Sequence, residues 1–292
     1  MSYVVDNAII MAAGLSSRFV PISYEKPKAL VKVKGEILIE RQIKQLKEAG
    51  ITDITIVTGY KQEAFAYLKD KFDVKLVENK EYQTRNNHAS LYVVKDQLKN
   101  SYICSADNYF KENPFTKENE ESYYASVFVK GKTNEWCMQI NEDDYIEKVE
   151  IGGRDAWVML GHVFFSNKFS ENLIRLIEKE YDEPETKDKL WEQIYIDHIN
   201  QLPMKIKRYD ASFIYEFDSL DELRCFDSWY CNHSDSKVIR QLCLKLNCEE
   251  KAIVNILPVK DISGQTCGMN FNVDKQMYYY DFEKGELHGI SK

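Results

Sequence analysis

The stretch "NAIIMAAGLSSRF", residues 7–19, carries the strongest fold signal in this chain of 292 residues. Its first half is a short apolar run that ends at Gly14, a pattern that predicts a buried strand feeding a loop. The loop contains Arg18, and Lys28 follows in "KPKAL". A loop after a parallel strand offers backbone N–H groups at the sheet edge where open α/β proteins bind ligands. The stretch therefore predicts an α/β protein with a loop suited to an oligophosphate.

Strands and helices alternate beyond this loop. Residues 35–50 predict a helix that stops at a glycine, and residues 61–72 and 88–98 predict two more. The predicted strands between them are residues 53–60, 74–79 and 101–107. This order predicts a Rossmann-like, mixed but mostly parallel sheet flanked by helices.

The second half of the chain has a different character. Residues after 107 predict antiparallel-type strands, then two helices, then a last apolar strand, at 122–130, 136–140, 145–151, 158–165, 169–181, 190–201 and 213–219. Near residue 233 the pattern changes again, to one amphipathic helix and three strand-like segments. We therefore expect one domain of residues 1–233 and a small α+β appendage of residues 234–292.

Composition excludes several classes of protein. With 47 acidic and 39 basic side chains, the formal charge of −8 argues against a broad nucleic-acid surface. The 7 cysteines include no C-x-x-C pair, which predicts reduced thiols and a cytoplasmic protein. We find no signal-peptide pattern and no apolar run long enough to span a membrane, so we expect neither secretion nor membrane insertion.

The cations of the loop suit phosphate oxygens. Arg18 can bind them in a fork, Lys28 supplies a compact point charge, and Pro21 and Pro27 stiffen the connection. Taken alone, the loop matches neither the P-loop nor the G-x-G-x-x-G pattern. A basic surface loop exposed to solvent is the alternative.

Carboxylates stand at two predicted strand ends. A triphosphate would need hard oxygen ligands for Mg²⁺, and Asp107 in "SADNYF" and the pair Glu216 and Asp218 in "IYEFDS" can supply them. The pair is two residues apart on a predicted strand and would share one face. The alternatives are a turn at Asp107 and a helix cap at Asp218 or Ser219.

Six motifs in order give these patterns a common meaning. They are "AGLSSRFVPISYEKPKALVKVKGEILIERQI", "NNHASLY", "SADNYF", "TNEW", "LWEQ" and "IYEFDS". Between about residues 5 and 230 the chain resembles the bacterial CTP:phosphocholine cytidylyltransferases of the sugar-phosphate nucleotidyltransferase superfamily. Ser16 stands where many members have a second glycine. The resemblance implies a GT-A-like fold and Mg²⁺-assisted transfer of CMP from CTP to phosphocholine, with release of pyrophosphate.

The resemblance also implies the site residues. Catalysis is expected from Lys28, Arg18 and Asp107, with Mg²⁺ held by Asp107, Glu216 and Asp218. The nucleotide-binding residues are expected to be Ala12, Ala13, Gly14, Leu15, Ser16, Ser17, Arg18, Lys28, Asn86, Asn87, Ser90 and Asp107. For Asn86 and Asn87, simple helix capping is the alternative. No catalytic histidine is expected, because the attacking phosphate oxygen is already deprotonated.

Phosphocholine carries a quaternary ammonium, which aromatic faces and nearby carboxylates hold best. The expected acceptor-binding residues are Trp136, Trp191, Glu135, Asp188, Glu192 and Tyr215, with a core role as the alternative for the tryptophans. Phosphoethanolamine and 2-aminoethylphosphonate remain alternative acceptors, and a non-catalytic nucleotide sensor is the alternative function. The appendage faintly resembles the start of a choline-kinase-like domain but is too short for one, which leaves truncation, packing and dimerisation open.

Overall fold

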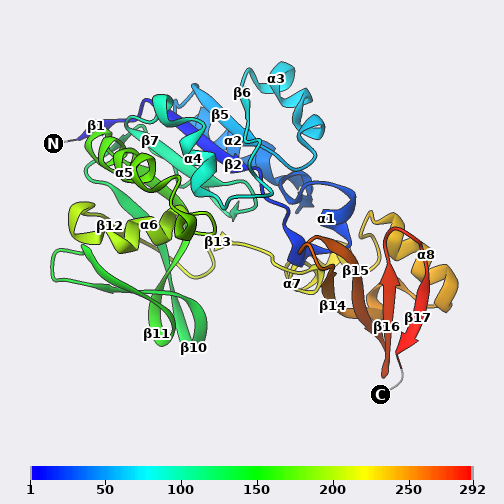
Figure 1. The fold of residues 1–292 in the computed structure, drawn as a ribbon. Coiled ribbons are helices and arrows are strands. Elements are labelled where there is room, and N and C mark those ends of the chain that lie inside the picture. Colours follow the sequence, from blue (N-terminus) through cyan, green and yellow to red (C-terminus); the bar gives the residue numbers. More distant parts are fainter. Residues whose placement is uncertain (1, 291–292) are drawn as a thin grey trace. The chain divides into compact units, whose positions relative to one another are not determined.

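A computed structural model describes residues 2–290 and divides the chain into two compact units (Figure 1). The first unit comprises the described residues up to Gly14 together with Leu38–Tyr215, and the second comprises Leu15–Ile37 and the described residues from Glu216 onward. The boundary that we predicted near residue 233 falls inside the second unit. The division into a domain of residues 1–233 and an appendage of residues 234–292 stays a prediction.

A sheet of seven strands, in the order β12-β10-β11-β7-β2-β5-β6, forms the centre of the first unit. β2 pairs in parallel with β5 and β7, and β5 pairs in parallel with β6. β11 pairs antiparallel with both β7 and β10, while β12 joins β10 in parallel. The predicted mixed, mostly parallel sheet with flanking helices is confirmed.

The strands of this unit are β1 Tyr3–Val4, β2 Asn7–Ala12, β5 Ile54–Thr58, β6 Lys75–Glu78, β7 Ser101–Ser105, β8 Tyr109–Phe110, β9 Glu118–Asn119, β10 Tyr123–Ile140, β11 Ile146–Phe165, β12 Lys205–Tyr209 and β13 Ile214–Tyr215. Its helices are α2 Leu38–Glu48, α3 Tyr67–Phe72, α4 His88–Tyr92, α5 Asn167–Glu180 and α6 Trp191–Asp197.

Alternation along the parallel strands builds a core on each face of the sheet. Ile9, Val57 and Ile103 join one buried cluster with residues of α4, α5 and α6. Their neighbours Ile10 and Ile56 point to the opposite face, because successive strand residues alternate. Both are fully buried. The two faces explain why these strands read as unbroken apolar runs.

Several predicted elements differ from those observed. In place of the four predicted antiparallel-type strands, the structure has two long ones, β10 and β11. They pair in antiparallel fashion with several bulges and are joined by a turn at residues 141–145. β12 was missed because Lys and Arg alternate with its apolar residues. The last predicted strand, residues 213–219, shrinks to β13, and a short α4 followed by a 3-10 turn replaces the helix predicted over residues 88–98.

The second unit combines the loop segment Leu15–Ile37 with the C-terminal part of the chain. It contains α1 Ile22–Glu25, β3 Lys32–Val33, β4 Glu36–Ile37, α7 Leu220–Phe226, α8 Lys237–Leu246, β14 Ile253–Lys260, β15 Thr266–Val273, β16 Gln276–Asp281 and β17 Leu287–Ile290. The last four strands form an antiparallel sheet in sequential order. The predicted small α+β appendage is therefore present, with one more strand than expected.

The cysteines and the helices of the chain bear on two predictions made from composition. All seven cysteines are free thiols, and Cys104 and Cys137 are buried. None of the described helices is long and apolar enough to cross a membrane.

Candidate functional site

The loop predicted to bind phosphates begins at the end of β2 in the first unit. Ala12 and Ala13 are buried, whereas Gly14 is exposed and a Cβ there would meet nothing within 4 Å. Behind the loop, Tyr60 N–H donates to the Ala13 carbonyl at 3.1 Å. A Cβ at Gly59 would lie 2.9 Å from that same carbonyl oxygen, so only glycine permits this approach. Sequence reasoning missed Gly59, although "TGY" directly after an apolar strand was a signal.

The remainder of the loop lies in the second unit and starts with a strained residue. Ser16 has φ +47, the left-handed region that favours glycine. Its carbonyl accepts from Phe19 N–H at 2.9 Å, which closes the 3-10 turn Ser17–Phe19. The conformation gives a physical reason for the glycine that many superfamily members have here. Leu15 and Arg18 are exposed and Ser17 is partly buried.

Lys28 and Arg18 meet the two predicted metal carboxylates in this unit. Lys28 Nζ lies 3.9 Å from Glu216 Oε1 and 3.8 Å from Asp218 Oδ1. Arg18 Nη1 lies 2.7 Å from Asp218 Oδ2. The Lys28 side chain is 4% exposed, while Glu216 and Asp218 are 34% and 37% exposed. Two cations and two carboxylates from opposite ends of the sequence thus form one compact cluster, which we call the cation–carboxylate cluster.

The geometry corrects one detail of the sequence argument. Glu216 and Asp218 were expected to share a face because they lie two apart on a strand, but β13 ends at Tyr215 and both acids follow it. Their carboxylates nevertheless lie together, because each has an oxygen within 4 Å of Lys28 Nζ. Ser219 caps α7 by accepting from Glu222 N–H, so the capping role belongs to Ser219 and leaves the Asp218 carboxylate to the cluster.

The donor chemistry of these acids fits a magnesium ion, since their partly exposed carboxylate oxygens are hard ligands. No group of three or more His, Cys, Asp or Glu side chains within either unit's described residues is arranged to hold a metal. A joint role of Asp107, Glu216 and Asp218 around one ion therefore stays a prediction.

Asp107 occupies a turn between β7 and β8 in the first unit. Ala106 N–H donates to the Met11 carbonyl at 3.1 Å, which ties this turn to the end of β2. The side chain of Gln42 from α2 donates to the carbonyls of both Ser105 and Asn108 at 2.8 Å. The turn alternative is therefore correct as a description of the backbone. The fixed, partly buried position is also compatible with a ligand-binding carboxylate.

Asn86 and Asn87 fasten the start of α4 to the segment before α6. Asn86 Nδ2 donates to the Asp188 carbonyl at 2.9 Å. Asn87 uses both ends of its carboxamide, since Oδ1 accepts from Trp191 N–H at 2.7 Å and Nδ2 donates to Glu192 Oε2 at 3.1 Å. The Asn87 side chain therefore makes no capping bond to α4.

Ser90 is buried and its hydroxyl accepts from Asn79 Nδ2 at 3.1 Å. His88 is fully buried with Nδ1 against the Lys189 carbonyl at 2.7 Å, and burial lowers its pKa. His88 is thus a structural residue at the start of α4. Whether Asn86, Asn87 and Ser90 contact nucleotide stays a prediction.

Glu192 is a predicted site residue whose carboxyl pKa departs clearly from its ordinary value. Its oxygens accept from Asn87 Nδ2 and, at 3.3 Å, from the Tyr124 hydroxyl. Burial raises the pKa of Glu192 from 4.5 to about 7, and these hydrogen bonds offset only part of the rise. A carboxyl group that changes charge near neutrality is suited to respond to a cationic ligand.

We expect Glu192→Gln to be more stable than the parent chain above neutrality. A carboxyl group whose pKa is raised on folding stabilises the fold fully below its unfolded pKa of 4.5, and that contribution is lost as pH rises through about 7. Thermal melts should therefore show the Tm of the variant, relative to the parent, rising by about 3 °C between about pH 5 and pH 8. Glu183→Gln, at an exposed acid, is the control. A Tm difference that stays constant with pH would contradict the assignment.

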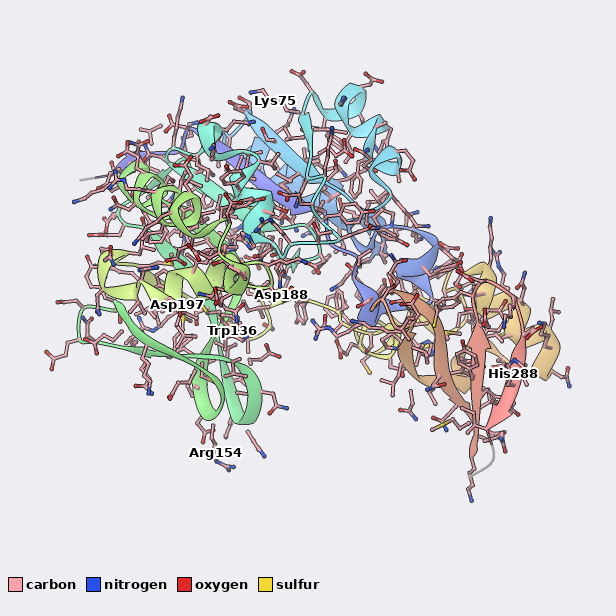
Figure 2. The ribbon with its side chains drawn as sticks, viewed as in Figure 1. Lys75, Trp136, Arg154, Asp188, Asp197 and His288 are labelled. Atoms are coloured by element: carbon pink, nitrogen blue, oxygen red, sulfur yellow. The ribbon has the colours of Figure 1, made fainter. Side chains whose placement is uncertain are left out.

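The two predicted cage tryptophans have different environments. Trp191, the first residue of α6, is 0% exposed, with Tyr124 stacked on one ring face and Phe165 at its edge. Trp191 is therefore a core residue, which was the alternative to a role in binding the acceptor. Trp136 on β10, labelled in Figure 2, is only partly buried and packs against the same core.

The other acceptor candidates are spread over the first unit. Glu135 and Asp188 are exposed, and Tyr215 on β13 is partly buried with its ring 6.4 Å from that of Tyr109. Glu135 directly precedes Trp136 on β10, in a stretch where the pairing with β11 has a bulge. An acceptor role for all of these residues stays a prediction.

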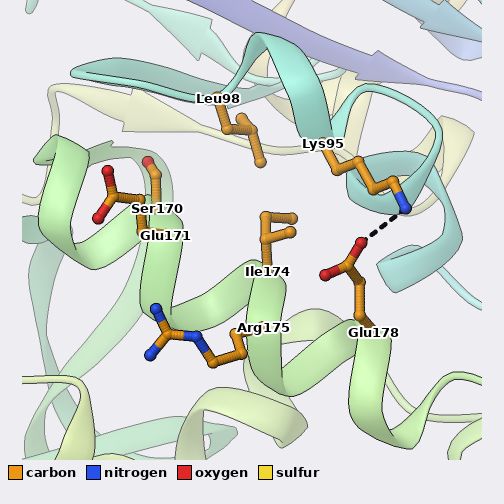
Figure 3. Close-up of a pocket in the computed structure, with 7 residues that line it drawn as sticks. All are labelled: Lys95, Leu98, Ser170, Glu171, Ile174, Arg175 and Glu178. Carbon is orange, nitrogen blue, oxygen red and sulfur yellow. Dashed lines mark hydrogen bonds and ion pairs between the residues drawn. The ribbon is translucent and has the colours of Figure 1, made fainter.

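A shallow pocket elsewhere in the first unit contains none of the predicted site residues. It lies between α5 and the 3-10 turn Lys95–Gln97, where Lys95 pairs with Glu178 at 2.6 Å (Figure 3). Its lining is Lys95, Leu98, Ser170, Glu171, Ile174, Arg175 and Glu178. We do not assign it to the reaction.

Comparisons with known proteins identify the family of the chain. Residues 8–111 match the MobA-like NTP transferase domain family. The chain is 39% identical over 218 residues to the choline-phosphate cytidylyltransferase of Streptococcus pneumoniae, covering 75% of this chain and 95% of that protein. It is 36% identical over 228 residues to the 2-aminoethylphosphonate cytidylyltransferase of Lancefieldella rimae, covering 77% of this chain and 93% of that protein.

Solved structures give the same result for the fold. The CTP:phosphocholine cytidylyltransferase from Streptococcus pneumoniae superposes with a TM-score of 0.74 at 38% identity, covering 77% of this chain and 99% of that chain. A putative glucose-1-phosphate thymidylyltransferase from Bacillus anthracis superposes with a TM-score of 0.63 at 18% identity. The second likeness concerns the fold alone.

Proposed function

Because the chain belongs to the family of the bacterial choline-phosphate cytidylyltransferases, we propose that it transfers CMP from CTP to phosphocholine and releases pyrophosphate. In the reaction an oxygen of the phosphocholine phosphate forms a bond to the α-phosphorus of CTP. The bond from that phosphorus to the oxygen leading to the β-phosphorus breaks, and pyrophosphate leaves with the electron pair. CDP-choline is the second product.

The cation–carboxylate cluster is the observation that carries this proposal. Lys28 is almost fully buried, and its charge is balanced by Glu216 and Asp218. A buried ammonium acts on a bound phosphate in a low effective dielectric, where its attraction is stronger than in water. Arg18 is 71% exposed and can turn from Asp218 toward a triphosphate.

Magnesium, when bound, would neutralise charge on the triphosphate as the pyrophosphate leaves. We propose that Asp107, Glu216 and Asp218 hold it. Glu216 and Asp218 would then exchange their pairing with Lys28 and Arg18 for the metal, which frees both cations to bind phosphate oxygens.

No side chain of the chain is needed as a general base. The second pKa of a phosphate monoester is about 6, so the attacking oxygen is largely deprotonated at neutral pH. The chain's residues therefore contribute alignment of the two phosphates and stabilisation of the charge on the leaving pyrophosphate.

A second candidate acceptor is 2-aminoethylphosphonate, because a relative named for that activity is nearly as similar as the phosphocholine relative. The partly buried Trp136 favours a quaternary ammonium, which makes no ordinary hydrogen bonds and binds to aromatic faces. A primary ammonium would depend more on acceptors such as the Glu192 carboxylate.

Trp136→Leu is expected to raise the KM for phosphocholine about tenfold with little change in kcat, because cation–π contacts contribute up to about 2 kcal/mol. Steady-state kinetics with saturating CTP measure this. Trp229→Leu is the matched control, since Trp229 is 61% exposed and its ring stacks on His233 in the second unit. Equal KM values for the Trp136 variant and the parent chain would remove Trp136 from the acceptor site.

The proposal is tested by a pyrophosphate-release assay that crosses CTP, UTP, ATP and GTP with phosphocholine, phosphoethanolamine and 2-aminoethylphosphonate. We expect the highest kcat/KM for CTP with phosphocholine. A preference for 2-aminoethylphosphonate would support the second candidate. Activity with UTP and a sugar phosphate but none with CTP would overturn both.

A further inference from the structure

We propose that the C-terminal appendage is a positioning element of the nucleotide-binding loop, which holds the cation–carboxylate cluster in its competent arrangement from both sides. The inference rests on the proposed function for the meaning of the cluster. Its structural basis lies entirely in the second unit, where the loop segment 15–37 and the appendage fold together.

The first connection runs through Glu25, which lies between Arg18 and Lys28 in the sequence. Its carboxylate accepts three hydrogen bonds at the start of α8, from Ser236 Oγ at 2.6 Å, Lys237 N–H at 2.9 Å and Val238 N–H at 3.0 Å. Glu25 thereby satisfies N–H groups that a helix start leaves unpaired, and its charge faces the positive end of the helix. Bonds of this charge-assisted kind are stronger than neutral ones.

The second connection is the neighbouring aromatic residue. The ring of Tyr24 stacks on that of Phe282, with centroids 4.2 Å apart and planes 18° apart. Phe282 directly follows β16, so the contact joins α1 to the appendage sheet. Two adjacent residues of the loop are thus fixed to two different elements of the appendage.

The carboxylate side of the cluster is attached as well. α7 begins two residues after Asp218, and its Asp221 accepts from Asn255 N–H of β14 at 2.8 Å. Arg224, buried on the same helix, donates to the carbonyls of Glu250 at 2.7 Å and Ile253 at 2.5 Å. The appendage therefore holds both the segment that carries the cations and the segment that carries the acids.

The lengths of the relatives add an independent observation. The Streptococcus pneumoniae relative is matched over 95% of its length by 218 residues of this chain, so it has little sequence left to supply an equivalent of the appendage. Our proposal gives this additional segment a role in the reaction. It predicts that loosening the appendage contacts lowers the fraction of molecules whose loop is ready to bind CTP, which raises the apparent dissociation constant in proportion.

The test uses the full chain with Glu25→Gln and, separately, Phe282→Leu. We expect each variant to raise the KM for CTP about tenfold and to change kcat by less than about twofold, because the chemistry of the bound complex is retained. The control is Tyr278→Leu, which removes an aromatic stack on Phe271 within the same sheet and should leave the KM for CTP unchanged. Equal KM values for the parent chain and both test variants would overturn the proposal, as would a matching rise in the control.

Hydrogen exchange supplies a readout that does not depend on activity. Amides of residues 15–30 should exchange faster in Glu25→Gln and Phe282→Leu than in the parent chain, and at the parent rate in Tyr278→Leu. Unchanged exchange in both test variants would contradict the positioning role. If the parent chain released no pyrophosphate with CTP and any acceptor, the proposed function would fail, while the exchange comparison would still decide whether the appendage orders the loop.

Discussion

Lys28→Ala is expected to lower kcat/KM for CTP by on the order of 10³-fold, comparable with the loss of one preorganised charge from an active site. The Lys28 side chain is 4% exposed, so no solvent molecule or mobile side chain can replace its ammonium group cheaply. We expect the fold to persist because Glu216 and Asp218 are about one-third exposed and can be solvated once their partner is removed. Steady-state kinetics and a thermal melt measured on the same preparation check both statements.

Lys26→Ala is the matched control, because Lys26 is the neighbouring cation of the same "KPK" motif and is less buried than Lys28. Its kcat/KM should stay within about twofold of the parent value. Near-parental activity of Lys28→Ala would contradict the proposed binding of the triphosphate by Lys28. An equal loss in both variants would point to general disturbance of the loop.

Asp107→Ala is expected to abolish most turnover, by on the order of 10³-fold in kcat, because it removes a carboxylate proposed to hold the metal that stabilises the leaving pyrophosphate. Its backbone turn is held by Gln42 and by the contact of Ala106 with Met11, neither of which depends on the Asp107 side chain. The folded structure should therefore survive. The measurement is kcat over a magnesium titration.

A magnesium titration separates a ligand from a residue that only shapes the turn. If Asp107 binds the ion, Asp107→Asn should require a higher magnesium concentration for half-maximal activity, whereas Asp96→Ala, at an exposed acid of a 3-10 turn, should not. An Asp107→Asn variant with the parental magnesium dependence and turnover would contradict the metal assignment.

The parallel half of the fold could be predicted from the sequence because its strands are apolar runs with clear ends. β2, β5 and β7 lie within the predicted segments, and the resemblance to the cytidylyltransferases is confirmed by the family comparison. The long hairpin was predicted as four strands because polar residues of its bulged middle interrupt the apolar pattern. β12 was not predicted because its basic residues interrupt the apolar run that would indicate a strand.

The candidate site was only partly predictable for a different reason. Residue types and order indicated Arg18, Lys28, Glu216 and Asp218, which the structure brings together. Their convergence could not be deduced from strand spacing, since β13 ends before the acids. The core position of Trp191 depends on contacts of α6 with Tyr124 and Phe165 of the sheet. Asn87 is held by two hydrogen bonds to the start of α6. No local pattern encodes either.

The appendage shows the same limit. Its amphipathic helix and its strands were visible in the sequence, yet nothing local indicated that Glu25 caps α8 or that Tyr24 stacks on Phe282. These contacts join residues more than two hundred positions apart. Only the folded chain shows that the loop and the appendage form one unit.

The main proposal for this chain is that CMP is transferred from CTP to the phosphate of phosphocholine. Phosphorus NMR of a reaction containing the chain, CTP, phosphocholine and magnesium tests it most directly, because it resolves the products separately. We expect the diphosphate signals of CDP-choline and the signal of pyrophosphate to grow in equal amounts as CTP and phosphocholine disappear. Formation of CMP and pyrophosphate with unchanged phosphocholine, or no consumption of CTP at all, would contradict it.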